Sequence, residues 1–352
     1  MSIEIFDGHL HVPRRGFLKA LTITGAGAML PPSLLVSQEK QSSEKVNRLT
    51  ARGGAIDVHH HYRPPLEGAV GNPKWSAQMS LDQMDKFGIA VSLLSMTQMR
   101  EQLYDGTEKG RKLMRFCNDF AAKLVQDHPT RFGLLSGIPL ADVDGSLKEI
   151  EYSYDALKAD GIGIYSSTGD RWPGDPMFDP IFQELNRRKA IVLIHPATPN
   201  CCKGLATGVP ESMIEYDFDL TRAAASLVAG GVLHKYPDVR FILVHSGGAL
   251  PVFAGRIRSR YPKDAKHAEF IPNGMIAELQ KFYFEVAHAT FKYPLAALRA
   301  FADPSHILFG TDYSPEAIET TVNELPTSGL TQAELQAIER GNAELLFPRF
   351  KA

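Results

Sequence analysis

Ala55-Ile56-Asp57-Val58-His59-His60-His61 is an apolar, strand-like run that ends in histidines. Three later segments share this design, with apolar residues leading to a metal-ligand side chain: Ile191–His195, Phe241–His245 and Ile307–Asp312. Strand ends spread over about 250 positions converge only if the fold brings them to one face. A barrel of parallel strands does so, because its active site lies at the C-terminal ends of the strands. We therefore predict a metal-dependent barrel enzyme.

The histidine spacing predicts the ligands. His59 and His61 are two positions apart, so in an extended strand both side chains point to the same face, while His60 points away. With His195 and Asp312 they make three imidazole nitrogens and a carboxylate, a set typical of zinc or manganese. Any one of these residues alone would more often be a hydrogen-bonded core residue. Four at predicted strand ends indicate a metal site.

The rhythm of the chain from residue 53 onward predicts the rest of the fold. Short runs rich in Val, Ile, Leu and Phe are typical of strands buried on both faces. They occupy 54–60, 89–96, 131–138, 161–166, 190–195, 240–245, 282–287 and 306–311. Helices are expected at 81–87, 109–128, 145–159, 178–188, 219–236, 293–302 and 331–346, the last with a capping box from Thr331 and Glu334. Eight alternating strands predict an α/β fold, a (β/α)8 TIM barrel of the metal-dependent hydrolase type.

Composition narrows the class of partner. The 352 residues have a net charge of −2 and are 44% hydrophobic, as in ordinary globular proteins. No basic excess favours nucleic acid. No segment is long and apolar enough for a stable membrane span. The three cysteines do not form a disulfide framework.

The first 52 residues have a different character. Arg14 and Arg15 precede an apolar stretch, which predicts a twin-arginine signal peptide at 1–36, a linker at 37–52 and the catalytic domain at 53–350. The protein would then be exported to the periplasm by the Tat pathway. The alternative is an amphipathic helix and a cytoplasmic protein. His9 and His11 imitate the ligand pattern, but they lie too close to the arginines for a barrel strand.

Other residues are candidates for catalysis or substrate binding. His245 begins His-Ser-Gly-Gly and is either a ligand or the base that activates a bound water, and we favour the base. Arg256 and Arg260, which follow it, are candidates for a bidentate clamp on a substrate carboxylate, against the alternative of a solvated helix face. His288, at the end of the seventh predicted strand, is a further candidate for substrate contact.

Six motifs make the chain resemble the amidohydrolase superfamily, in the branch that includes aminocarboxymuconate-semialdehyde decarboxylase. Within that branch it looks most like the 6-methylsalicylate decarboxylase type. The motifs are Asp57–His61, Gly174–Pro180, His195-Pro196, Tyr236–Phe241, His245–Gly248 with Gly255-Arg256, and Phe309–Tyr313. Two departures lie near the pocket: Ser314 separates Tyr313 from Pro315, and Glu285 and His288 end the seventh strand where an aspartate and small residues are usual.

The resemblance implies one divalent metal ion, usually zinc, on His59, His61, His195 and Asp312. It implies His245 as the catalytic histidine, with Asp312 sharing proton transfer, and no organic cofactor. The predicted fourth strand lacks the lysine that bridges two ions in binuclear relatives, which favours a single ion. Members are often homodimers, and in some an arginine crosses to the partner's substrate, which points to Arg256 or Arg260.

Three functions compete at this stage. The leading one is a nonoxidative decarboxylase of a small aromatic or enoic carboxylic acid. The alternative is a hydrolase of an amide, ester or lactone, which would use the same metal site. The third is a non-catalytic barrel that binds ligands. Fold alone does not choose between them.

Overall fold

The computed structural model describes residues 53–66, 75–96 and 106–351. The predicted signal peptide and linker, with His9, His11, Arg14 and Arg15, lie outside this range. Within it, no helix combines the length and the apolar character that crossing a membrane requires.

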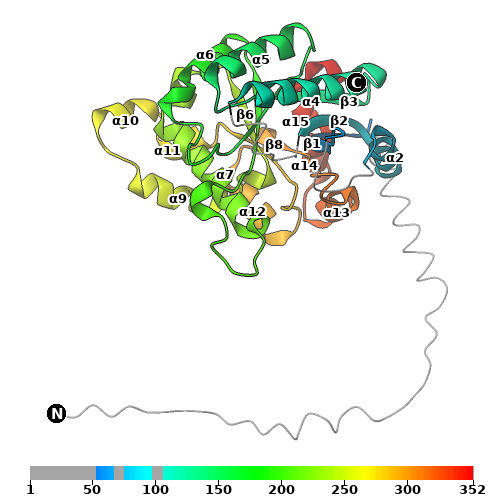
Figure 1. The fold of residues 1–352 in the computed structure, drawn as a ribbon. Coiled ribbons are helices and arrows are strands. Elements are labelled where there is room, and N and C mark those ends of the chain that lie inside the picture. The colour runs from blue at the N-terminus through cyan, green and yellow to red at the C-terminus, as the bar shows by residue number, and fades with distance from the viewer. Residues whose placement is uncertain (1–52, 67–74, 97–105, 352) are drawn as a thin grey trace, which may run out of the picture. The chain divides into compact units, whose positions relative to one another are not determined.

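Eight parallel strands surround the centre of the molecule (Figure 1). They follow one another in chain order: β1 (Ala55–Tyr62), β2 (Ile89–Met96), β3 (Phe132–Gly137), β4 (Gly161–Tyr165), β5 (Ile191–His195), β6 (Arg240–Leu243), β7 (Tyr283–Glu285) and β8 (Ile307–Leu308). Their apolar side chains are buried in one continuous core. The predicted (β/α)8 barrel is confirmed, and each strand overlaps its predicted run.

Helices cover the outside of the barrel. They are α2 (Ala77–Phe87), α4 (Glu108–Asp127), α5 (Val143–Asp155), α6 (Asp179–Arg187), α7 (Glu211–Ala229), α8 (Val232–Lys235), α9 (Leu250–Arg260), α10 (Ala265–Phe270), α11 (Met275–Leu279), α12 (Lys292–Phe301), α13 (Ile318–Glu324), α14 (Gln332–Gln336) and α15 (Asn342–Leu346). Two expectations change. The helix expected at 219–236 begins eight residues earlier and is broken after Ala229, because Gly231 adopts a left-handed conformation. The last helix contains a π turn at Ala337–Gly341, while its capping box is confirmed.

The first and last strands close the barrel. The amide of Val58 donates to the carbonyl of Phe309 at 3.0 Å, and the amide of Asp312 donates to the carbonyl of His59 at 2.9 Å. The buried carboxylate of Asp57 reinforces this seam, because it accepts hydrogen bonds from the amide and the hydroxyl of Thr311 at 3.0 and 2.6 Å. The seam therefore sets the His59–His61 segment beside Asp312.

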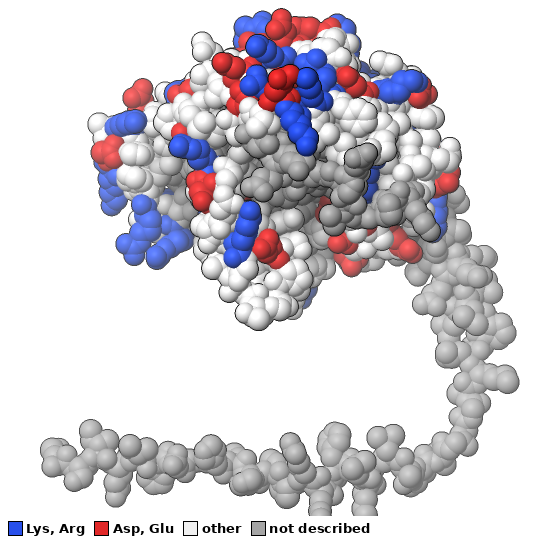
Figure 2. All heavy atoms as spheres, viewed as in Figure 1, with Lys and Arg blue, Asp and Glu red and all other residues white. Residues whose placement is uncertain are grey.

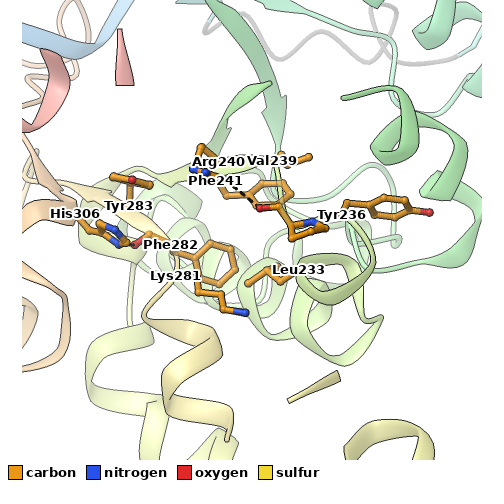
Figure 3. A pocket seen from close by; sticks show the side chains of 10 residues that line it. Leu233, Tyr236, Val239, Arg240, Phe241, Lys281, Phe282, Tyr283 and His306 are labelled. Atoms are coloured by element: carbon orange, nitrogen blue, oxygen red, sulfur yellow. Dashed lines mark hydrogen bonds between the residues drawn. The ribbon is translucent and has the colours of Figure 1, made fainter. Parts of the chain in front are cut away.

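A cavity at the opposite end of the strands is not the active site. It is lined by residues at the N-terminal ends of β6 and β7 and just before β8, among them Arg240, Phe282, Tyr283 and His306 (Figure 3). The predicted ligands stand at the C-terminal ends, where barrel enzymes place their chemistry.

Candidate metal centre and active site

Four side chains from three strand ends meet at the C-terminal face of the barrel. His59 and His61 lie on β1, His195 ends β5, and Asp312 follows β8. One ligand atom from each lies within 4.8 Å of the others. Nε2 of His61 is 2.9 Å from Nε2 of His59 and 2.8 Å from Oδ1 of Asp312. The structure thus brings together the whole set expected from the sequence.

The outward nitrogens of the three histidines define their protonation. Each Nδ1 meets an oxygen acceptor outside the cluster: Glu285 Oε1 at 2.9 Å for His59, the Ser95 carbonyl at 3.2 Å for His61 and the Pro196 carbonyl at 3.0 Å for His195. Because these oxygens accept, each Nδ1 carries the hydrogen, and Nε2 keeps a lone pair. Three lone pairs and a carboxylate then converge.

This arrangement fits a divalent cation. Oδ1 of Asp312 is buried and has no hydrogen-bond partner among the described residues, although Nε2 of His61 is close. Buried polar atoms are rarely left unsatisfied in this way. A cation satisfies the oxygen and the nitrogen lone pairs together, and three nitrogens with one oxygen suit a catalytic ion that keeps an open position.

The electrostatics of the cluster favour the ligand forms. Burial lowers the pKa of His61 to about 4 and, with the neighbouring imidazoles, lowers the pKa of His195 well below its usual value. Both rings are therefore neutral at pH 7, as metal ligands must be. Burial alone would raise the pKa of Asp312, but the neighbouring imidazoles of His59 and His245 hold it well below its usual range.

Glu285 is a functional residue that sequence reasoning missed. It is fully buried on β7, and its Oε1 lies 2.9 Å from Nδ1 of His59. The same oxygen accepts the backbone N–H of His245 at 2.6 Å, and Oε2 accepts that of Ala287 at 2.6 Å. The carboxylate therefore orients one ligand and fixes the backbone of the catalytic candidate. A signal was present, because a charged residue inside an apolar strand is seldom buried without a partner.

His245 and His288 approach the other oxygen of Asp312. Nε2 of His288 is 3.0 Å from Oδ2, and Nε2 of His245 is 3.5 Å from it. His245 is buried and its Nε2 has no hydrogen-bond partner among the described residues. Burial alone would lower its pKa, but Asp217 and Asp312 raise it to about 10. His245, His288 and Asp312 also have left-handed backbones, a strain found mainly at functional sites.

Arg256 and Arg260 are not brought into this cluster. Both lie on the exposed surface of α9, and neither guanidinium has a hydrogen bond or ion pair with another described side chain. Asp57, the acidic residue of β1, serves the β1–β8 seam. Of the three substrate-binding candidates, only His288 contacts the metal-site residues.

Glu285→Gln is expected to weaken metal binding by about 10- to 100-fold, because it removes the carboxylate that orients His59. The measurement is the Kd for Zn²⁺ and Mn²⁺ in competition with a chelator. Glu278→Gln is the matched control, since Glu278 on α11 is equally buried but pairs with Lys281. Equal Kd values for the two variants would contradict the role of Glu285.

Comparisons with known proteins agree with this geometry. The amidohydrolase family model matches residues 56–349. The chain is 33% identical to 6-methylsalicylic acid decarboxylase of Penicillium expansum over 84% of its own length and 97% of the relative's. It also resembles the crystal structures of 2,6-dihydroxybenzoate decarboxylase from Rhizobium (TM-score 0.74, 21% identity, 84% and 98% covered) and of a dihydroxybenzoic acid decarboxylase from Polaromonas with bound manganese (TM-score 0.72, 22% identity, 85% and 97% covered). The chain belongs to the amidohydrolase family, among its metal-dependent decarboxylases.

Proposed function

We propose that the chain releases CO2 from a small hydroxylated aromatic acid of the 6-methylsalicylate kind. The observation that carries the proposal is the cluster of three imidazoles and one carboxylate beside a buried, unpartnered His245 nitrogen. The similarity to 6-methylsalicylic acid decarboxylase over nearly the whole barrel supports this substrate class. It also favours the carboxy-lyase over the hydrolase and over a non-catalytic barrel.

The chemistry requires one proton and one bond cleavage. The ring carbon that bears the carboxylate gains a proton, the C–C bond breaks, its electron pair returns to the ring, and CO2 leaves. His59, His61, His195 and Asp312 would hold a divalent cation, which would supply positive charge to bind and polarise the acid. His245 and Asp312 hold and deliver the proton, because Nε2 of His245 lies 3.5 Å from Oδ2 of Asp312.

We propose zinc as the ion, with manganese as the alternative. Three imidazoles and one carboxylate suit Zn²⁺, which prefers nitrogen ligands in four-coordinate sites. The manganese bound in the Polaromonas enzyme supports the alternative. Nothing in the proposed proton transfer calls on an organic cofactor.

The N-terminal segment supports a proposal about location. We propose that residues 1–36 are a twin-arginine signal peptide and residues 37–52 a linker, so that the enzyme works in the periplasm. Export of a reporter fused to residues 1–36, abolished by Arg14→Lys with Arg15→Lys, is the expected result. Export that survives both substitutions would defeat it.

An exposed apolar surface supports a homodimer. Met213 on α7, Val252 on α9 and Tyr293 on α12 are 66%, 68% and 74% exposed, and Phe218 contacts Phe253 between α7 and α9. In Figure 2 the lowest bulge of the surface is mostly white, with acidic residues to its right. Such patches on a soluble protein mark interaction sites. We propose that α9 lies at the interface and carries Arg256 and Arg260 toward the partner's substrate.

A panel of acids tests the reaction. The purified protein loaded with Zn²⁺ or Mn²⁺ should release CO2 from 6-methylsalicylate and 2,6-dihydroxybenzoate. It should release far less from 2-methylbenzoate, which lacks the hydroxyl oxygen beside the carboxylate. Chelation should abolish turnover, and adding the ion back should restore it. Lactone or amide hydrolysis without CO2 release would overturn the proposal, as would full activity in a metal-free protein.

His245→Asn tests the proton donor. Asparagine tolerates the left-handed backbone at this position (φ 49°), so the loop is expected to keep its shape. Turnover should fall by about 10²- to 10⁴-fold while the metal content stays near one ion per chain. Loss of the ion would instead make His245 a ligand, and unchanged turnover would remove it from the reaction.

Mixing two inactive variants tests the crossing arginine. If Arg260 acts in the partner's site, Arg260→Ala and His245→Asn chains should regain activity when unfolded and refolded together, because mixed dimers contain one intact site. Arg258→Ala, on the same exposed helix, is the control and should stay active. Sedimentation at the mass of one chain would contradict the dimer.

A further inference from the structure

Asp219 is a fully buried carboxylate on α7, outside the cluster that holds the ligands. Its Oδ2 accepts hydrogen bonds from the hydroxyls of Ser166 at 2.5 Å and Ser167 at 2.7 Å. Its Oδ1 accepts the indole N–H of Trp172 at 2.7 Å. Three donors converge on it, and the guanidinium of Arg222 lies 3.9 Å from its Oδ1. A buried charge with this many donors is a built feature, since burying it unsatisfied is costly.

Ser166 connects Asp219 to the backbone around His195. Its amide donates to the carbonyl of His195 at 2.7 Å, and its hydroxyl oxygen accepts the amide of Ala197 at 2.8 Å. The serine is therefore hydrogen-bonded to the residues on both sides of Pro196. Because its hydroxyl has a single hydrogen, which it donates to Asp219, the oxygen is left to accept from Ala197.

The segment that Ser166 holds also orients the ligand ring. Nδ1 of His195 donates to the carbonyl of Pro196 at 3.0 Å. Pro196 lies between His195 and Ala197, the two residues whose backbones are hydrogen-bonded to Ser166. A shift of this segment would turn the imidazole and move its Nε2. The partners of a ligand's second nitrogen commonly set both its orientation and its metal affinity.

We propose that Asp219 is a positioning residue for the metal site, which acts on His195 through the hydroxyl of Ser166 and the backbone of residues 195–197. Its role parallels that of Glu285 for His59, with the difference that Glu285 touches the ligand ring and Asp219 acts through two intermediates. The inference rests on the proposed role of His195 as a ligand.

Neighbouring contacts on α7 are consistent with this role. Oδ1 of Asp217 is 3.6 Å from Nδ1 of His245. The hydroxyl of Thr221 accepts the amide of Ala249 at 3.0 Å, in the loop after His245. The turn from 217 to 221 thus contacts the segments that follow β4 and β6, and Asp219 acts on the segment after β5 through Ser166.

A pair of neighbouring serines provides the test. Ser166→Ala and Ser167→Ala each remove one hydroxyl that donates to Oδ2 of Asp219, but only Ser166 also holds Ala197. With each full-length variant, the Kd for Zn²⁺ and Mn²⁺ is measured by chelator competition. Ser166→Ala should raise it by about 10- to 100-fold, and Ser167→Ala should leave it near the wild-type value. Asp219→Asn should raise the Kd as Ser166→Ala does. The double variant Ser166→Ala with Asp219→Asn should have a Kd no higher than that of the weaker-binding single variant, because both residues act through one connection.

Thermal unfolding separates positioning from a general loss of stability. A positioning role predicts that the rise in Tm on adding metal shrinks in Ser166→Ala, because a bound ligand stabilises the fold less as its Kd rises. An equal fall in Tm with and without metal, and an unchanged Kd, would overturn the inference. If Asp219→Asn does not fold, the two serine variants decide alone. A wild-type chain that binds no metal would instead overturn the proposed metal site.

Discussion

The closure of the barrel between β1 and β8 is the constraint on which the active site depends. Asp57 carries it, because its carboxylate receives the amide and the hydroxyl of Thr311 across the seam. The adjoining backbone bond from Asp312 to His59 then places a ligand from near the end of the chain beside ligands from near its start. Without that seam nothing would hold the carboxylate of Asp312 next to the imidazoles of His59 and His61.

Buried carboxylates organise the rest of the site from several directions. Glu285 holds His59 and the amide of His245, and Asp219 holds the chain after His195 by way of Ser166. Burying so many charges costs free energy, which each carboxylate recovers through two or more hydrogen bonds. The left-handed backbones of His245, His288 and Asp312 add strain that these contacts withstand. The buried charges and the backbone strain therefore lower the stability of this region, while they fix the positions of the candidate ligands.

Periodic patterns in the sequence predict the strands, but they do not reveal side-chain contacts between residues far apart in the chain. Apolar runs and the two-residue spacing of His59 and His61 follow directly from strand geometry, so the eight strands and the convergence of the four candidate ligands were predictable. In the sequence Glu285 stands out only as a departure from the family pattern, because no local pattern shows that its carboxylate meets a histidine 226 positions away. Asp219 gave no signal, since one acidic residue in a helix is ordinarily solvated. Gly230-Gly231 did offer a signal for the break after α7, which the periodicity alone concealed.

The order of the ligands along the chain has a consequence for biosynthesis. Two candidate ligands stand on the first strand, one on the fifth, and the last follows the eighth. A nascent chain therefore has no complete site until its eighth strand has been made and the barrel has closed. Binding of an ion by the complete set of candidate ligands is then coupled to closure of the barrel. For a chain exported in folded form, as proposed above, the ion is chosen in the compartment where folding ends, and the enzyme carries that choice with it.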